Sequence, residues 1–250
     1  MCIRDREKMP MIGGNTVRAE GGINAAETPQ QKKAGIPDTI DQFYADTMKG
    51  GHNLNDPALV RTLTTHAKDA VAWLVSLGAD LNTVGRAGGA KYPRAHRPTD
   101  GSAIGPEVIR VLWKAAKDRK MDVRTQTRAT EIIMKDGRVA GVKATNKDGK
   151  VYTIDAKAVV LATGGFGANQ DMLVKYQPKL KGYATTNQPG ATGDGIILAE
   201  HAGAALVDMK QIQAHPTAAP DGTLISESVR GDGGILINAE GKRFTNELMT

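Results

Sequence analysis

A serine, a glutamate and an arginine stand close together near the end of the sequence, at Ser226, Glu227 and Arg230. The serine hydroxyl can donate a hydrogen bond to a carboxylate. The glutamate and the arginine are three residues apart, a spacing that allows a surface salt bridge of little energetic value. The residues alone therefore leave the role of this group open between chemistry and a solvated ion pair.

One of the five histidines has a distinctive setting. His215 lies in the tripeptide His-Pro-Thr, where Pro216 stiffens the chain. We single it out as a candidate binding residue. The other four have no partner motif, and we expect them to be structural or solvated: His52, His66, His96 and His201.

The 29 glycines include six adjacent pairs. Paired glycines let the backbone adopt positive φ and lie close to something bulky. Two or three pairs would be ordinary turns, but six favour a ligand that passes several loops. Asp194 stands between two glycines where a helix is predicted to begin, and the sequence alone favours a simple N-cap there. The pairs are Gly13-Gly14, Gly21-Gly22, Gly50-Gly51, Gly88-Gly89, Gly164-Gly165 and Gly233-Gly234.

The composition is that of an ordinary globular protein, with 250 residues, 40% hydrophobic and 24% charged. The formal net charge of +6 is scattered, without a basic run interleaved with aromatics, so we predict no nucleic-acid partner. A mild positive excess suits small anionic substrates. No apolar run is long enough to span a bilayer. Cys2 is the only cysteine, so we predict neither an internal disulfide nor a metal site.

The helices that must position these residues are predicted from spacing and caps. One is expected near 39–49, and another starts at Pro57, capped by Asp56, and stops at Gly78. A third covers 106–117, and shorter ones cover 171–175 and 194–202. In the helix from Pro57, the positions expected to face inward are Leu59, Leu63, Ala67, Val71 and Leu74; in the third helix they are Val108, Val111, Leu112 and Ala115.

The predicted strands form a meander. A short strand at 123–125 precedes three strands at 130–134, 139–145 and 151–154, and the dipeptides Asp136-Gly137 and Asp148-Gly149 separate those three. The continuous apolar run Ala158–Gly165 then predicts a strand buried on both faces of a parallel sheet. This order is typical of two-dinucleotide-binding flavoproteins, although any α/β domain with a hairpin could show it. A further strand is expected at Ile235–Asn238.

Four separated segments of the sequence resemble the flavocytochrome c or soluble fumarate reductase flavoproteins, in order and at about the spacing of that family. The resemblance extends from Glu7 to Thr250. A match at four motifs is far more specific than a single glycine pattern. The segments are Glu7–Thr16 continuing through Glu20–Ala26, then Gly190–Gly195, Gln213–Thr217 and Ser226–Gly231.

The resemblance implies FAD as the cofactor and assigns it a set of binding positions. Glu7 matches the acid that accepts from the ribose hydroxyls. Ala129 matches a backbone contact on the adenine side, and Asp194 matches an acid that contacts the flavin. The remaining positions wrap the pyrophosphate and the isoalloxazine: Asn15, Thr16, Gly21, Gly22 and Ile23.

The resemblance also implies reduction of the C=C bond of fumarate to succinate. A hydride would come from flavin N5, and the chain would bind a small dicarboxylate. His215 and Ser226 would hold a substrate carboxylate together with Glu227 and Gly21, and Glu227 and Arg230 would form a proton relay. The electron-donor module, whether haem, FMN or quinol dehydrogenase, would lie outside this segment. The alternatives are a related enoate reductase for urocanate or methacrylate, or a gene fragment without function.

The implied fold class is α/β: a Rossmann-like FAD-binding domain with a β-meander, plus the start of a capping domain. We expect residues 7–212 to form the FAD-binding domain and 213–250 to begin the substrate-capping domain. Residues 1–6 resemble the translation of a sequencing adapter and are expected to be a non-native leader. The family's first glycine-rich loop would precede Glu7, and its acid arginine would follow Thr250 directly. The 250 residues alone are therefore expected to bind FAD weakly and to lack reductase activity.

Overall fold

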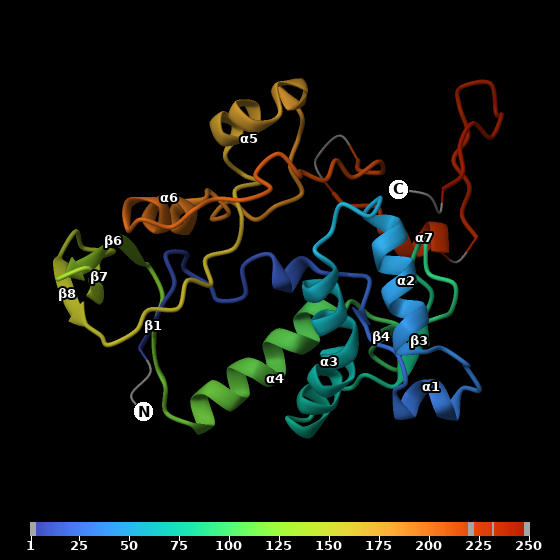
Figure 1. Ribbon diagram of the computed structural model, residues 1–250, viewed down its shortest axis with the longest axis horizontal. Coiled ribbons are helices and arrows are strands. Elements are labelled where there is room, and N and C mark those ends of the chain that lie inside the picture. The colour runs from blue at the N-terminus through green and yellow to red at the C-terminus, as the bar shows by residue number, and fades with distance from the viewer. Residues whose placement is uncertain (1–3, 220–222, 232, 248–250) are drawn as a thin grey trace. The chain divides into compact units, whose positions relative to one another are not determined.

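The computed structural model describes residues 4–219, 223–231 and 233–247, and the chain divides into two compact units (Figure 1). The first unit contains residues 1–15 and 116–224, and the second contains 16–115 and 225–250. Three residues of the expected leader, with Cys2 among them, lie outside the described residues. The predicted boundary between 212 and 213 stays a prediction.

Three helices of the second unit begin within two residues of where the sequence predicts, and its other described helices were not predicted. Helix α3 spans Pro57–Ser76, and the side chain of Asp56 accepts hydrogen bonds from the backbone N–H groups of residues 58 and 59. It ends before Gly78, whose φ of 91° suits a residue without a side chain. Its neighbours are α1 (Pro29–Lys33), α2 (Ile40–Gly50), α4 (Ile104–Asp118), the short η1 (Thr16–Arg18) and α7 (Glu227–Gly231).

The core of the second unit lies between α2, α3 and α4. The predicted inward face of α3 is confirmed at Ala67, Val71 and Leu74 but was wrong in the first two turns. Leu59 and Leu63 are 70% and 57% exposed, while Val60 and Thr64 are buried in their place. The helix is rotated so that the neighbouring position in each of its first two turns faces the core. Val111 is buried as predicted, and Val108 and Leu112 pack beside it. The buried cluster comprises Ala25, Ala26, Phe43, Ala67, Val71, Leu74, Ala79, Leu81, Ile104 and Val111.

A small antiparallel sheet in the second unit was not predicted. Its strands are β2 (Ile23–Asn24), β3 (Thr83–Gly85) and β4 (Ala95–Arg97), in the order β2-β4-β3. Ile23 pairs with His96, and Val84 pairs with His96 from the other side. The strands are only two or three residues long, which is too short for a periodic pattern to reveal.

The first unit contains the predicted meander. Strands β6 (Thr127–Lys135), β7 (Arg138–Asn146) and β8 (Val151–Asp155) pair antiparallel in sequence order. Asp136 and Gly137 have φ of 52° and 73°, as a two-residue hairpin turn between β6 and β7 requires. Helices α5 (Gln170–Tyr176) and α6 (Asp194–His201) confirm two further predictions, and η2 (Pro178–Leu180) follows α5.

A parallel pair of strands precedes the meander in the first unit. Strand β1 (Arg4–Arg6) pairs with β5 (Asp122–Arg124), and Nη2 of Arg6 lies 3.0 Å from Oδ2 of Asp122. Part of the expected leader thus lies in a strand. That these residues are non-native stays a prediction.

Two predicted strands are absent from the described structure. Residues 158–165 have no strand partner there, and the side chain of Val160 is 89% exposed. An apolar run favours burial, but a strand forms only where neighbouring strands bond its backbone groups. At Ile235–Asn238 the structure has an isolated bridge between Ile237 and Arg243. None of the described helices is long and apolar enough to cross a membrane.

Candidate functional site

Glu7 stands where β1 ends in the first unit, and its backbone joins two further strands. Its N–H donates to the carbonyl O of Arg124 and its carbonyl accepts from the N–H of Thr127, both at 2.9 Å. Oε1 accepts from the N–H of Met9 at 2.7 Å, whereas Oε2 has no partner among the described residues. One carboxylate oxygen therefore remains able to accept from a ribose hydroxyl, as the predicted role of Glu7 requires.

Asp194 is the centre of a charged cluster in the first unit. Its Oδ2 lies 3.2 Å from Nζ of Lys8 and 2.9 Å from Nε of Arg128, and its Oδ1 accepts from the hydroxyl of Thr192 at 2.7 Å. Burial raises the pKa of Asp194, but the hydrogen bonds from Thr192, Arg128 and Lys8 outweigh it and the net pKa is lowered. The carboxylate is ionised and compensated by two cations.

The simple N-cap role for Asp194 was wrong. The N-cap of α6 is Gly193, with φ of 79°, and Asp194 is the first helical residue. Its negative charge at the helix N-terminus interacts favourably with the helix dipole. The side chain of Asp194 is still 14% exposed, and its predicted contact with the flavin stays a prediction.

Three predicted cofactor residues lie in or next to this cluster. Asp194 belongs to it, and Glu7 and Ala129 each adjoin one of its two cations in the chain. Lys8 follows Glu7, and Arg128 precedes Ala129, which lies half-buried on β6 opposite Ala144. Sequence reasoning missed both cations, although their adjacency to predicted positions was a signal that could have found them.

Asn15 is held by a separate contact within the first unit. Its Oδ1 accepts from the backbone N–H of Gln188 at 2.7 Å, and its Nδ2 donates to Oδ1 of Asn187. The predicted residue is therefore tied to the segment that leads into the Gly190–Gly195 motif.

The second unit holds the glycine-rich part of the predicted cofactor positions. Thr16 opens η1, and Gly21 and Gly22 lead into β2, which begins at Ile23. Gly22 has φ of 136°, and a Cβ there would lie 2.9 Å from the carbonyl O of His96. A Cβ on Gly21 would meet nothing within 4 Å. The backbone therefore lies against β4 at Gly22 and has open space beside Gly21. Such open space would let a bulky ring lie beside this segment.

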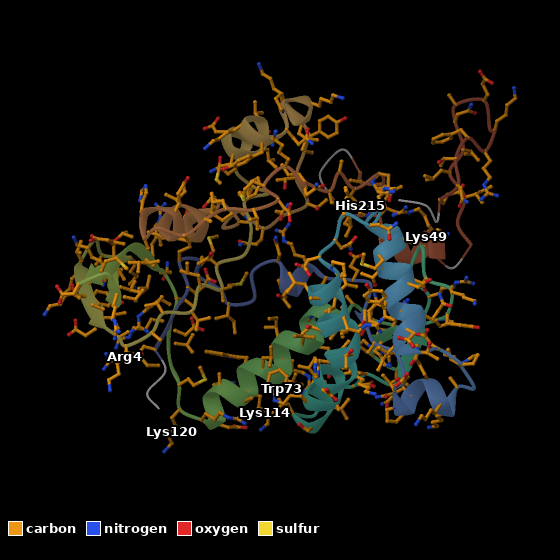
Figure 2. All side chains as sticks on the ribbon, in the orientation of Figure 1. Arg4, Lys49, Trp73, Lys114, Lys120 and His215 are labelled. Carbon is orange, nitrogen blue, oxygen red and sulfur yellow. The ribbon has the colours of Figure 1, made fainter. Side chains whose placement is uncertain are left out.

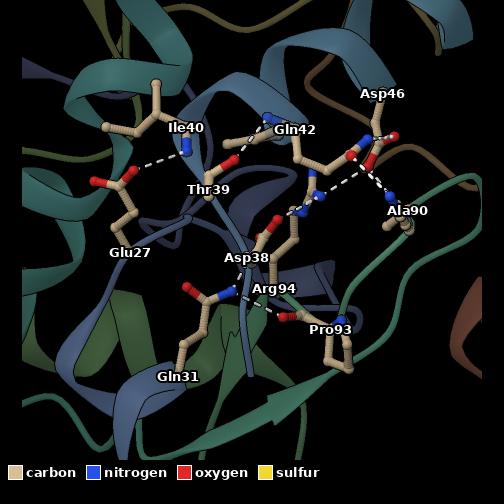
Figure 3. A network of polar contacts seen from close by, with 12 residues as sticks. Glu27, Gln31, Asp38, Thr39, Ile40, Gln42, Asp46, Ala90, Pro93 and Arg94 are labelled. Carbon is tan, nitrogen blue, oxygen red and sulfur yellow. Dashed lines mark hydrogen bonds and ion pairs between the residues drawn. The ribbon is translucent and has the colours of Figure 1, made fainter. Parts of the chain in front are cut away.

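A buried polar network lies in the same unit (Figure 3). Nη2 of Arg94 lies 2.9 Å from Oδ1 of Asp38 and 2.7 Å from Oδ2 of Asp46. Nε2 of Gln31 donates to Oδ2 of Asp38 at 3.1 Å and to the carbonyl O of Pro93 at 2.8 Å. The network joins Arg94, which directly precedes β4, to Asp38 before α2 and to Asp46 within α2.

His96 is fully buried in the same region. Its Nε2 lies 2.8 Å from the hydroxyl of Thr28, and its Nδ1 lies 2.9 Å from the carbonyl O of Arg94 and 3.2 Å from that of Ile23. The geometry assigns the proton to Nδ1. Burial lowers the pKa of His96, so the ring is neutral. The prediction that His96 is structural is consistent with this position.

The predicted relay residues do not bind each other. Oε1 of Glu227 accepts from the N–H of Gly88 at 2.8 Å, and Nη1 of Arg230 donates to the carbonyl O of Glu247 at 3.1 Å. No ion pair joins Glu227 to Arg230 in the described part of the chain, so the surface salt bridge that their spacing allows is not formed. Ser226 is half-buried directly before α7.

Glu247 was not predicted and is one of the few buried acids. Nη2 of Arg243 lies 2.6 Å from its Oε2, and the N–H of Leu236 donates to its Oε1 at 2.8 Å. The hydrogen bonds from Arg243, followed by that from Leu236, lower its pKa to about 2. The acid thus fixes the chain that follows α7.

His215 belongs to the first unit and is half-buried (Figure 2). Its Nδ1 lies 2.9 Å from the carbonyl O of Thr217. This contact orients the ring and leaves Nε2 without a partner among the described residues. Within 4–219, 223–231 and 233–247, no three His, Cys, Asp or Glu side chains gather in a way that could hold a metal ion.

Comparisons with known proteins agree with one another. Residues 6–250 match the FAD binding domain family. The fumarate reductase (cytochrome) of Shewanella frigidimarina is 51% identical over 246 residues, which are 98% of this chain and 43% of that protein. The urocanate reductase of Eggerthella lenta is 36% identical over 97% of this chain and 41% of its own length.

A solved structure of the open conformation of a flavocytochrome c3 fumarate reductase has the same fold. It matches with a TM-score of 0.88 and 43% identity, covering 98% of this chain and 44% of that one. The chain spans about two fifths of the length of the relatives that it matches.

Proposed function

This chain belongs to the FAD-binding domain family, and we propose that the whole protein reduces the C=C bond of fumarate to succinate. The observation that carries the choice of fumarate is the similarity to the Shewanella frigidimarina fumarate reductase along nearly the whole chain. The α/β fold with its antiparallel meander supports the same family.

The residues of the chain fit FAD. When bound, this cofactor supplies the hydride that reaches one carbon of the double bond. Glu7 offers Oε2 to the ribose, and Gly21 leaves room for a bulky group beside the backbone. Asp194, held by Lys8 and Arg128, keeps a fixed negative charge near the start of α6. We propose these contacts together with those of Asn15, Thr16, Gly22, Ile23 and Ala129.

His215 of the first unit and Ser226 of the second are proposed to bind a substrate carboxylate, and Glu227 and Gly21 of the second unit are further proposed substrate-binding residues. The ring of His215 is oriented by the carbonyl of Thr217, which leaves its other nitrogen to face a ligand. A hydroxyl at Ser226 supplies a further donor. Both interactions suit an anion such as a dicarboxylate.

Glu227 and Arg230 are the proposed proton relay. Their side chains do not compensate each other, and each bonds a backbone group of the second unit: the N–H of Gly88 for Glu227 and the carbonyl of Glu247 for Arg230. Because the charge of neither side chain is compensated by the other, we propose that the pair passes a proton towards the substrate.

A urocanate reductase is the second candidate, because such an enzyme from Eggerthella lenta matches the chain over almost its full extent. Urocanate and fumarate share a carboxylate conjugated to a C=C bond, so the proposed roles of His215 and Ser226 suit either. Methacrylate is a third substrate of the same chemistry. An electron-donor module that carries haem or FMN, or oxidises quinol, is proposed as the partner.

The test is anaerobic turnover of the FAD-loaded whole protein with reduced methyl viologen and equal concentrations of fumarate, urocanate or methacrylate. We expect fumarate to be reduced fastest, with succinate as the product. Faster turnover with urocanate would move the assignment to the second candidate. Oxidation of viologen at the rate of an enzyme-free blank with all three would refute an enoate reductase.

A further inference from the structure

Arg97, the last residue of β4, is half-buried and has one unsatisfied guanidinium nitrogen. Its Nε is buried without a hydrogen-bond partner, and no ion pair or hydrogen bond of this side chain occurs in the described part of the chain. A buried N–H without a partner costs free energy, so native proteins rarely keep one unless something else binds there. Arg94, three residues earlier in the chain, binds two carboxylates.

Two glycines lie beside Arg97. A Cβ on Gly85 of β3 would collide with its Nη2. The register Ile23–His96, continued by one step, places Gly22 opposite Arg97, and a Cβ on Gly22 would lie 3.2 Å from Cβ of Ala95. Since side chains alternate along a strand, the face from which Arg97 projects carries Gly22, Gly85 and Ala95, together with the polar residues Asn24 and Thr83.

The opposite face of the sheet is closed. His96 is fully buried there, and Ile23 packs against the hydrophobic core. On the face that carries Arg97, Ala95 is also buried but Asn24 is exposed, and we place a ligand beside Gly22 on this face. The glycines at 22 and 85 let the guanidinium lie close to the backbone, where a larger residue would displace it.

We propose that Arg97 binds an anionic, oxygen-bearing group of the ligand that lies against Gly21 and Gly22. This inference rests on the proposed function, because the ligand contact of that segment is itself proposed. A guanidinium carries five donors in a planar fork that matches carboxylate and phosphate oxygens. The group belongs either to FAD or to the dicarboxylate, and both sources offer the same chemistry to Arg97.

The test compares Arg97→Gln, which removes the charge, with Arg97→Lys, which keeps the charge and removes the fork. Arg61→Gln is the matched control, because it removes one positive charge from an exposed ion pair with Asp41 in the same unit. Two affinities are measured on the whole protein: that for FAD, from the quenching of flavin fluorescence, and that for succinate, from the perturbed spectrum of bound oxidised flavin.

We expect Arg97→Gln to weaken one of the two affinities by roughly tenfold or more, as loss of a charge-assisted hydrogen bond does. Arg97→Lys should fall between it and the wild type, and Arg61→Gln should match the wild type. Loss of FAD affinity identifies the cofactor as the source of the anion, and loss of succinate affinity alone identifies the substrate.

The inference is overturned if Arg97→Gln, folded by circular dichroism, changes both affinities by less than twofold relative to Arg61→Gln. If Arg97→Gln does not fold, the affinities of Arg97→Lys for FAD and succinate are compared with those of Arg61→Gln. Changes of less than twofold in both affinities would then overturn the inference. Wild-type protein that binds neither FAD nor succinate refutes the proposed function, and this inference with it. Wild-type binding that is insensitive to residue 97 refutes the inference alone.

Discussion

Arg94 and Asp38 form an ion pair with 2.9 Å between Nη2 and Oδ1, and their side chains are only 2% and 0% exposed. Two charges removed from water are stable together only when further hydrogen bonds satisfy them. Gln31 supplies one such bond to Asp38, and Asp46 supplies a second carboxylate to Arg94. The guanidinium also lies over the ring of Phe43, 4.7 Å from its centroid.

Replacing Arg94 by Met should destabilise the protein strongly. It would leave the carboxylate of Asp38 buried without its cation, a change that typically costs about 3–5 kcal/mol. The control is Arg61→Met, whose exposed pair with Asp41 should contribute about 1 kcal/mol or less. Urea denaturation followed by circular dichroism measures both. Equal losses of unfolding free energy in the two variants would show that the buried pair stabilises the protein no more than the exposed pair does.

Gly22→Ala and Gly21→Ala should separate folding from ligand binding. At Gly22 the added Cβ meets the carbonyl O of His96 at 2.9 Å, and φ is 136°, so we expect a loss of at least about 1 kcal/mol. At Gly21 nothing lies within 4 Å, so stability should be kept. Thermal unfolding without added FAD measures this difference.

The same pair of variants also tests the predicted role of Gly21 beside FAD. The Gly21→Ala protein should fold normally but bind FAD more weakly, because its methyl group occupies the open space that the ligand needs. Unchanged FAD affinity in Gly21→Ala would contradict the predicted contact.

Glu247 should link stability to acid pH. Its pKa in the folded protein is about 2, against 4.5 for an ordinary glutamate, so its ionised form is favoured by folding. The stabilisation is present above pH 4.5 and is lost as the pH falls towards 2. NMR titration of the carboxyl carbon should give the low pKa, and Arg243→Met should raise it. The control Lys242→Met removes an adjacent exposed cation, and an equal rise there would contradict a specific effect of Arg243.

His215→Ala and Glu227→Gln should affect different kinetic constants of fumarate reduction. His215 is proposed to bind a carboxylate that is charged throughout the reaction, so its loss should raise KM more than it lowers kcat. A relay acts only when the proton moves, so Glu227→Gln should lower kcat by about a hundredfold or more. Glutamine keeps an oxygen that can accept from Gly88, so the fold should be retained.

Steady-state kinetics of both variants across pH measure these constants. If Glu227→Gln keeps kcat within about twofold while weakening fumarate binding, Glu227 belongs to the substrate pocket rather than to a relay.

Local signals in the sequence predicted the elements of the fold well. Asp136 and Gly137 encode the first meander turn by their tolerance of positive φ, and Asp56 with Pro57 encodes the start of α3. The inward face of α3 was harder, because Leu59 and Val60 are both apolar and adjacent. Spacing alone cannot decide which of two neighbours faces the core when both fit a helical period.

The parts that could not be predicted depend on contacts between distant residues. Arg94 and Asp38 are 56 positions apart, and nothing in the local sequence of either indicates the other. Similarly, Lys8 reaches Thr192 and Asp194 across most of the chain. Motif resemblance located Asp194 but not the two cations that compensate it, since motifs report positions and not the partners that folding supplies.

The interleaving of the two units sets an order for their formation during translation. The hydrophobic cluster of the second unit lies entirely between Ala25 and Val111, so its parts are available early. Lys8, in contrast, must wait for Thr192, 184 residues later, which is roughly 10–40 s at ordinary elongation rates. During that interval the helical core can already be packed and β1 can pair with β5, while Lys8 still lacks this contact. The charged contacts around Asp194 therefore form only after the residues of the helical core have been synthesised.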